Sequence, residues 1–157
     1  DSDDWVDFNA TSRIGCQVEL AKIHGHLTAR ESEPLQRVID RLQDLIPRHP
    51  APALIHGDLW SGNTIATVDP DTNTPRIAVI DPAVSIGDPW ADIAMMQLFG
   101  GFPKPCLDAY ILANPDHDRL ESRIGVYQLY HMLNHLNIFG TSYKHAALSI
   151  AHQLLAI

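Results

Sequence analysis

Cysteine and clustered positive charge are both scarce in this sequence. Only two of its 157 residues are cysteines, Cys16 and Cys106, and they form no Cys-x-x-Cys pair. This scarcity argues against a disulfide scaffold and a cysteine zinc site, and it is typical of a protein of the reducing cytoplasm. The net charge is -8 and no run of Lys or Arg occurs. We therefore expect neither a nucleic-acid-binding surface nor a surface for anionic membranes.

Long apolar runs are missing as well. No stretch reaches the roughly 20 apolar residues that a membrane-spanning helix needs, so no membrane association is expected. Hydrophobic residues nevertheless make up 45% of the chain, which is enough to build a core. Length and composition together predict a single domain over residues 1–157.

Two helices are predicted before residue 50. The first covers about residues 5–27, and acids at its start favour a helix N-terminus. These acids are Asp1, Asp3, Asp4 and Asp7, and the expected core residues are Trp5, Phe8, Val18, Ala21 and Ile23. The second helix lies between Pro34 and Pro47, where apolar residues recur at the spacing of one helical face. These residues are Leu35, Val38, Ile39, Leu42, Leu45 and Ile46.

Short strands are predicted only in the middle of the chain. They cover residues 53–56, 64–68 and 76–80, which are short apolar or β-branched runs bounded by turn residues. Further helices are predicted at about 90–98, 104–113, 117–139 and 142–156, separated by Gly and Pro. Helices therefore dominate, and the expected fold class is mainly α with a small β element.

Polar side chains suited to phosphoryl transfer follow these strands. The stretch HGDLWSGN, residues 56–63, carries Asp58 and Asn63, and Asp81 follows the third strand. The spacing of His56, Asp58 and Asn63 matches the H-x-D-x-x-x-x-N loop of kinases. In that loop the Asp orients the attacking hydroxyl and accepts its proton, while the Asn and a later strand-end Asp hold Mg²⁺. Asp58 is therefore the candidate catalytic base, and Asn63 and Asp81 are the candidate metal ligands.

The same loop also fits simpler interpretations. Gly57 and Gly62 have the spacing of a phosphate-binding P-loop, but Asn63 follows where that motif has Lys, so we reject it. A lone Asp in a strand-end loop is commonly a turn former or a helix cap. A non-catalytic helical binding module therefore stays open as an alternative. The two hypotheses differ in whether Asp58, Asn63 and Asp81 come together.

Nine histidines raise a third hypothesis, a His-based metalloenzyme. His131 and His135 are spaced i, i+4 on one predicted helix, as in zinc proteases, but the Glu of the H-E-x-x-H motif is missing. A metal site at this pair would need a third ligand side chain.

Three segments together resemble one known family. HGDLWSGN at 56–63, IDPAV at 80–84 and ADIAMMQLFGGFP at 91–103 are similar to the fructosamine (ketosamine) kinase family. This family belongs to the aminoglycoside-phosphotransferase and choline-kinase group, which has a protein-kinase-like fold. LWSGN and LFGGF are the more specific parts. The resemblance implies phosphorylation, by ATP with Mg²⁺, of a sugar hydroxyl on a small or protein-bound glycated amine, a step of deglycation repair.

The resemblance also implies roles for further residues. Asp92 matches a buried Asp that, together with His56, supports the backbone of the catalytic loop, and Trp60 is expected at the substrate pocket. The simpler interpretations are a helix-dipole contact for Asp92 and core packing for Trp60. Pro82 stands where kinases usually have Phe. In addition, DPWA precedes Asp92 where many family members are charged, which weakens the sugar-amine assignment more than the kinase assignment and keeps an aminoglycoside- or choline-type acceptor open.

No segment ahead of the first predicted helix supplies the other half of a kinase nucleotide site. That half would hold a glycine-rich loop, a phosphate-binding Lys and its Glu partner. The three lysines, Lys22, Lys104 and Lys144, all lie outside the predicted strands. We therefore expect a C-terminal catalytic lobe without its N-terminal nucleotide-binding lobe. Such a lobe should bind ATP weakly, be inactive alone and self-associate through the face left uncovered.

Overall fold

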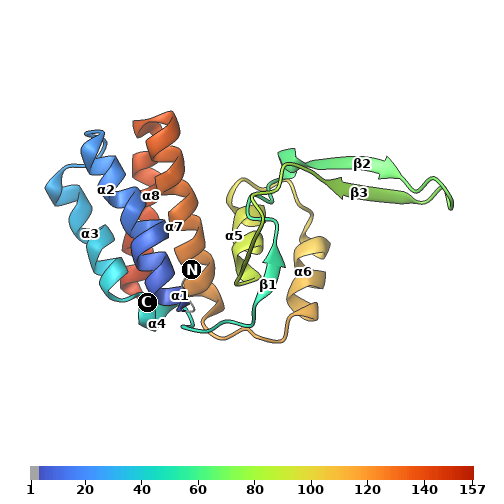
Figure 1. Cartoon of the computed structure of the whole chain (residues 1–157), viewed down its shortest axis with the longest axis horizontal. Helices are drawn as coiled ribbons and strands as arrows, with labels where there is room; N and C mark the ends of the chain where they lie inside the picture. The colour runs from blue at the N-terminus through green and yellow to red at the C-terminus, as the bar shows by residue number, and fades with distance from the viewer. Residues whose placement is uncertain (1–3) are drawn as a thin grey trace. The chain divides into compact units, whose positions relative to one another are not determined.

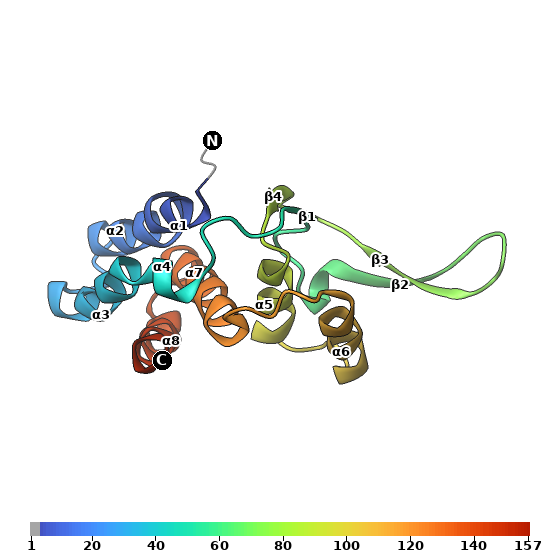
Figure 2. The same ribbon diagram turned by 90° about the horizontal axis from the view of Figure 1, so that it is seen from below.

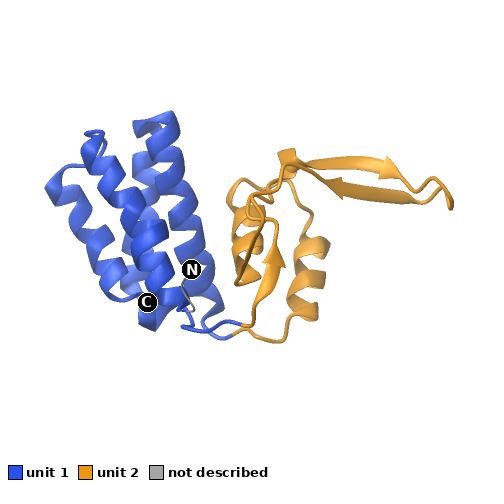
Figure 3. Ribbon diagram, in the orientation of Figure 1, with its two compact units in different colours: residues 1–50, 118–157 blue, residues 51–117 orange. Residues whose placement is uncertain are grey.

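The computed structural model describes residues 4–157, which divide into two compact units. Unit 1 combines residues 1–50 with 118–157, and unit 2 comprises residues 51–117 (Figure 3). Helices make up most of the described structure, and its strands form two separate two-stranded antiparallel sheets. The predicted class, mainly α with a small β element, is therefore confirmed. The kinase-like lobe and the single domain stay predictions.

Unit 1 is a bundle of helices (Figures 1 and 2). Its first rod runs through α1 (Trp5–Phe8), a π-helical stretch (Asn9–Gly15) and α2 (Cys16–Ile23). The next helices are α3 (Ala29–Asp40) and the short α4 (Leu42–Leu45). The remaining elements are α7 (Leu120–Phe139), a 3-10 turn (Thr141–Tyr143) and α8 (Lys144–Ala156). α8 packs against both α3 and α7, and α2 packs against α7.

Aliphatic side chains from these helices form the core of unit 1. They come from one face of each helix, as the helical period requires. Those without exposure include Ile14, Leu35, Val38, Leu42, Leu133, Leu136 and Ala151. This alternation of buried and exposed positions is what made the helices predictable from sequence.

The first rod differs from the regular helix predicted over residues 5–27. It widens into a π-helix that ends at Gly15, where a Cβ atom would collide with the carbonyl oxygen of Ala10. It ends at Ile23, because Gly25 adopts the left-handed backbone with a φ of +71°. Val18 and Ala21 are buried as predicted. Ile23 is 79% exposed, so its predicted place in the core is wrong.

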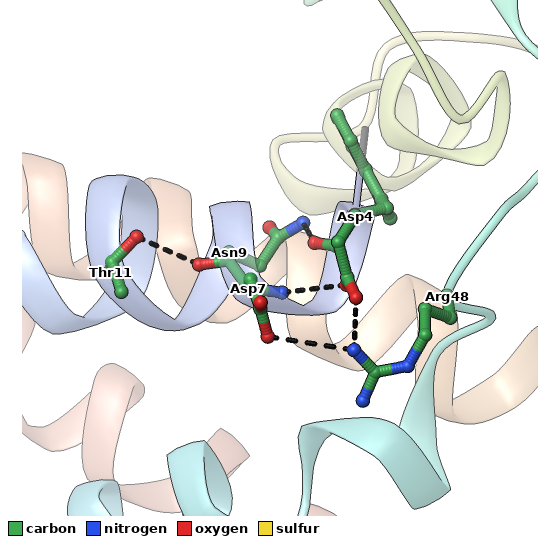
Figure 4. A network of polar contacts seen from close by, with 6 residues as sticks. Asp4, Asp7, Asn9, Thr11 and Arg48 are labelled. Carbon is green, nitrogen blue, oxygen red and sulfur yellow. Dashed lines mark hydrogen bonds and ion pairs between the residues drawn. The ribbon is translucent and has the colours of Figure 1, made fainter. Parts of the chain in front are cut away.

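Ion pairs connect the N-terminal end of α1 to the segment after α4 (Figure 4). Arg48 forms an ion pair with Asp4 and lies 3.6 Å from the Asp7 carboxylate. Asp4 also caps α1, since its side chain accepts the Asp7 N–H at 3.0 Å. This hydrogen bond, together with Arg48, lowers the pKa of Asp4. Asp1 and Asp3, the other acids expected here, lie outside the described residues.

α3 begins before Pro34, where the sequence predicted its start. Thr28 and Glu31 form a capping box: the Thr28 N–H donates to Glu31 Oε2 at 2.8 Å, and the Glu31 N–H donates to Thr28 Oγ1 at 3.3 Å. Pro34 therefore lies inside the helix. The T-x-x-E pattern at residues 28–31 is a known helix-start signal and could have placed this boundary.

Unit 2 combines two small antiparallel sheets with two helices (Figure 1). β1 (Ala53–Ile55) pairs with β4 (Ser85–Gly87), and β2 (Thr64–Val68) pairs with β3 (Pro75–Val79). The two helices are α5 (Trp90–Leu98) and α6 (Lys104–Ala113). All of these elements except β4 were predicted. Trp90 of α5 is buried, meets the Tyr110 ring of α6 edge-on, and donates from Nε1 to the Asp116 carbonyl at 2.8 Å.

The β2–β3 hairpin extends away from the rest of unit 2 (Figures 1 and 2). Asp69 organises its turn: Oδ1 accepts the N–H groups of Asp71 and Thr72 at 3.0 and 2.8 Å, and the carboxylate also pairs with Arg76. One face of the hairpin carries exposed apolar side chains. These are Val68, Ile77 and Val79. The predicted self-association, through the face where an N-terminal lobe would pack, stays a prediction.

A buried histidine in α7 couples the stability of unit 1 to pH. His131 is 8% exposed. Burial, with smaller effects of His135 and Arg13, lowers its pKa from 6.5 to about 4. The folded-state pKa thus lies below the unfolded one, so between these two values the proton binds preferentially to the unfolded chain. The free energy of unfolding should therefore fall as the pH falls through this window.

Replacing His131→Gln should remove most of this dependence. In the parent chain, protonation of His131 should lower the free energy of unfolding on the order of 2–3 kcal/mol when the pH falls from 7 to 4.5. Urea denaturation at both pH values measures the difference. His145→Gln, at an exposed position of α8, is the matched control and should keep the parent slope. An equal slope in His131→Gln and the parent chain would contradict the assignment.

Candidate active site

A carboxylate from α5 holds the loop that follows β1. Asp92 is buried in the first turn of α5. Its Oδ2 accepts the His56 N–H and its Oδ1 accepts the Gly57 N–H, both at 2.8 Å. Each carboxylate oxygen thus fixes one of two successive peptide groups, and such charge-assisted hydrogen bonds are the strong ones. This is the geometry expected of a residue that supports the loop backbone.

The His56 side chain links this loop to the end of β3. Its Nε2 lies 3.0 Å from the Ile80 carbonyl oxygen. A carbonyl oxygen can only accept, so Nε2 is the protonated nitrogen, and in the neutral ring Nδ1 faces the Asp58 N–H at 3.4 Å. The Ile80 N–H in turn donates to the Asn63 carbonyl at 3.0 Å. Ile80, the residue before Asp81, is therefore bonded to both ends of the 56–63 loop.

Asp58 and Asn63 are in direct contact. Asn63 Nδ2 donates to the Asp58 carbonyl oxygen at 2.9 Å and to Asp58 Oδ2 at 3.0 Å. A 3-10 turn at Ser61–Asn63 closes the five-residue interval between them. The two hydrogen bonds from Nδ2 fix the orientation of the Asn63 amide, so its oxygen faces away from Asp58. Asn63 is buried and Asp58 is half-buried.

Asp81 occupies an uncommon backbone conformation beside this loop. Its φ of +53° lies in the left-handed region, which Asp tolerates better than most non-glycine residues. The segment that it opens passes close over the loop, because a Cβ atom at Gly57 would collide with the Ala83 carbonyl oxygen. The structure thus brings the backbones of the three predicted residues together, with side-chain contact between Asp58 and Asn63. The Asp81 carboxylate is exposed.

Trp60 lies on the outside of the same loop, where it meets a second segment. It is 40% exposed, its ring covers Gly62, and it contacts Phe99 edge-on with 6.5 Å between the ring centroids. Ser61 packs against Gly101, where a Cβ atom would collide with it. LWSGN and LFGGF are therefore in contact. Sequence reasoning singled out both segments, but it did not pair them and it missed Phe99 and Gly101 as site residues.

The site offers oxygen ligands for a divalent cation. The Asn63 amide oxygen and the Asp81 carboxylate are groups that Mg²⁺ accepts, and Mg²⁺ bound with substrate phosphates needs only one or two carboxylates from the protein. The two positions are neighbours through the Asn63–Ile80 hydrogen bond. The residues present therefore fit a Mg²⁺ site next to a candidate base.

The histidine pair of α7 does not form a comparable site. Within residues 4–157, no three His, Cys, Asp or Glu side chains are arranged to hold a metal ion. His135 Nδ1 donates to the His131 carbonyl at 2.8 Å. The metalloenzyme hypothesis thus lacks its third ligand in the described part of the chain. Over the same residues, no helix is both long and apolar enough to cross a bilayer.

Sequence comparison decides the family. The fructosamine kinase family model matches residues 1–157, which is the whole chain. The chain belongs to the fructosamine kinase family. This confirms the resemblance carried by HGDLWSGN, IDPAV and ADIAMMQLFGGFP.

Named relatives of the family are similar over nearly the whole chain. A probable ketoamine kinase of Synechocystis sp. is 38% identical over 158 residues, which cover 99% of this chain and 50% of that protein. The ketosamine-3-kinase of Mus musculus is 37% identical over 153 residues, which cover 96% of this chain and 47% of that protein. The chain thus spans about half the length of the relatives it matches.

A solved structure of the family shares the fold. A crystal structure from Thermobifida fusca, of a protein provisionally named fructosamine-3-kinase, superimposes with a TM-score of 0.84 at 33% identity. The match covers 98% of this chain and 52% of that one. The mainly helical architecture with small sheets is therefore an arrangement that the family shares.

Replacing Asp92→Asn should destabilise unit 2. An amide can accept one of the two N–H groups, but its own NH₂ then faces the other donor. Leaving that buried N–H without an acceptor should cost about 2–3 kcal/mol of unfolding free energy. Asp108→Asn is the control, because Asp108 is exposed and pairs with Lys104 on the surface of α6; it should cost less than about 1 kcal/mol. If urea denaturation shows equal losses of unfolding free energy in the two variants, the hydrogen bonds of Asp92 do not stabilise unit 2 more than a surface ion pair does.

Proposed function

We propose that the protein is an ATP-dependent kinase that phosphorylates a sugar hydroxyl of a ketosamine, a step of deglycation repair. The observation that carries the proposal is the contact of Asp58 with Asn63 in a loop clamped by Asp92. Relatives named ketoamine kinase, ketosamine-3-kinase and protein-ribulosamine 3-kinase support this class of acceptor. The acceptor is then a small or protein-bound glycated amine.

Asp58 is the group that we assign to the acceptor hydroxyl. Phosphoryl transfer depends mostly on positioning, so the base must be held where the hydroxyl arrives. The Asn63 amide donates to Asp58 Oδ2 at 3.0 Å and so orients the carboxylate. Oδ1 is then the oxygen that would meet the acceptor hydroxyl. Asp58 would orient the hydroxyl and take its proton as the hydroxyl oxygen bonds to the γ-phosphorus of ATP and the bond from that phosphorus to the leaving ADP breaks. The other members of the loop, His56 and Asp92, would serve as positioning residues.

Mg²⁺ would be held by the Asn63 amide oxygen and the Asp81 carboxylate. When bound, the ion would supply positive charge that offsets the negative charge of the ATP phosphates during transfer. The Asn63 amide is already turned for this task by its hydrogen bonds to Asp58. Trp60, on the outside of the loop, is the residue that we assign to the acceptor pocket.

The setting of this site is part of the same proposal. We assign the chain to the C-terminal catalytic lobe of a protein-kinase-like fold, which the helical content and the small sheets support. A cytoplasmic location agrees with two cysteines, Cys16 and Cys106, that are both free and exposed.

Asp58→Asn in the full-length protein should lower kcat on the order of 100-fold or more, because the amide cannot take the hydroxyl proton. An ADP-release assay with a glycated lysine measures this, and the free energy of unfolding should stay within about 1 kcal/mol of the parent, since the replacement keeps the shape of the side chain. Asp108→Asn should keep the parent kcat. Aminoglycoside and choline are assayed in parallel. Near-normal turnover by Asp58→Asn would refute the role of Asp58, and turnover of choline or an aminoglycoside alone would refute the ketosamine assignment.

Asp81→Asn should change the dependence on metal as well as the rate. Losing one carboxylate ligand should raise the Mg²⁺ concentration for half-maximal rate about tenfold or more. Asp58→Asn provides the contrast, because it should lower kcat and leave this Mg²⁺ midpoint in place. A Mg²⁺ titration of both variants at saturating ATP makes the comparison. An unchanged midpoint in Asp81→Asn would argue that Asp81 is not a ligand.

A further inference from the structure

Two aromatic rings beside the Asp58 loop form a corner that the surrounding glycines make possible. The Trp60 and Phe99 rings meet at an interplanar angle of 71°, and they are 40% and 42% exposed. Large aromatic side chains are usually much more deeply buried. The partly exposed rings of Trp60 and Phe99, next to a candidate base, therefore indicate a surface for a ligand rather than core packing. We call this pair the aromatic corner.

The Trp60 ring is held from one side by the loop itself. It covers Gly62 so closely that a Cβ atom there would collide with three atoms of the indole. The Trp60 N–H also donates to the Asp58 carbonyl at 3.1 Å, and the Asn63 N–H donates to the Trp60 carbonyl at 3.0 Å. The backbone that carries the ring is thus tied to both candidate site residues of the loop. The attachment point of the ring is therefore fixed relative to Asp58, while the direction of the ring depends on its neighbours.

Phe99 contacts the Trp60 ring edge-on, and a glycine turn follows Phe99 directly. Gly100 and Gly101 have φ values of +68° and +91°, which side-chain-bearing residues rarely adopt. Gly101 also packs against Ser61 too closely for a Cβ atom. The turn after α5 therefore lies directly on the loop, and Phe99, at the end of α5, reaches Trp60 from it.

We infer that Phe99 is a positioning residue that sets acceptor specificity by holding Trp60 for the amine of the ketosamine. This inference rests on the proposed function. A ketosamine differs from its parent sugar by a basic nitrogen, which is a cation at neutral pH, and an aromatic face attracts such a cation. The indole face lies on the loop that carries Asp58, so a cation bound there places the attached sugar near the candidate base.

Kinetics of the full-length protein with two acceptors test this inference. The acceptors are a glycated lysine and free fructose, which lacks the nitrogen. Phe99→Ala should raise KM for the glycated lysine about five- to tenfold and leave kcat, KM for ATP and the rate with fructose within twofold. Phe99→Tyr, which keeps the ring, should restore the parent KM. Phe139→Ala, at an exposed aromatic residue of unit 1, should behave like the parent.

Three outcomes overturn the inference. They are an unchanged KM in Phe99→Ala, an equal rise for both acceptors, or a rise in KM for ATP instead. If the parent enzyme does not phosphorylate the glycated lysine at all, the proposed function falls together with this inference. If the parent enzyme phosphorylates the glycated lysine and Phe99→Ala has the same KM for it, this inference alone fails and the proposed function stands.

Gly62 provides a second test that does not depend on the kinetics of Phe99. The three nearest neighbours of a Cβ atom at Gly62 are atoms of the Trp60 ring, and the φ of Gly62 lies outside the left-handed region. Gly62→Ala should therefore displace the ring and raise KM for the glycated lysine as much as Phe99→Ala does. In a Trp60→Ala background these three ring atoms are removed, so adding Gly62→Ala should change neither KM nor the thermal midpoint. A further rise in KM in that background would show that Gly62 acts through something other than the ring, against the inference.

Discussion

The two hydrogen bonds from the His56 and Gly57 N–H groups to the Asp92 carboxylate are the contact on which the site depends. They fix the first residues of a loop that has little secondary structure of its own. The Asn63 side chain then bonds to Asp58 and closes the loop. His56 and Asn63 also bond to Ile80, which fixes the backbone next to Asp81. The order of these contacts runs from a helix to a loop to a hairpin. α5 therefore helps to position oxygen atoms that belong to two separate segments, the 56–63 loop and the segment that follows β3.

The local part of the site could be predicted from sequence, and the part that joins distant segments could not. Asp58 and Asn63 lie five residues apart between two strands, so a tight loop must bring them close. The link to Asp92 spans some 35 residues, and no spacing rule reaches that far; only the family resemblance suggested it. Phe99 was missed for the same reason. Its contact with Trp60 depends on two left-handed glycines, and sequence shows the glycines but not where the turn they form points.

The fold follows the same division. α5 and α6 appear at the predicted residues because glycines and prolines mark their ends, namely Pro89, the segment from Gly100 to Pro103, and Pro115. The predictions were wrong where hydrogen bonds, rather than the apolar pattern, determine the type or the boundary of a helix. The π-helical stretch ending at Gly15 keeps an apolar pattern that periodicity cannot distinguish from an α-helix, and the start of α3 is set by the Thr28–Glu31 cap rather than by Pro34. β4 has only three residues, which is too few to show a strand pattern in the sequence. It forms a strand because it pairs with β1.

The hairpin between Asn63 and Asp81 has a consequence for how the family can vary. Its ladder runs from Thr64 opposite Val79 at the base to Val68 opposite Pro75 at the tip. Since antiparallel pairing adds residues two at a time, one on each strand, a longer or shorter hairpin moves the tip and leaves the base in register. Evolution can therefore lengthen, shorten or redecorate residues 69–74 without disturbing the distance between Asn63 and Asp81. The same stretch is a natural place to graft a reporter or an epitope, because residues 69–74 lie at the far end of the ladder from Asn63 and Asp81.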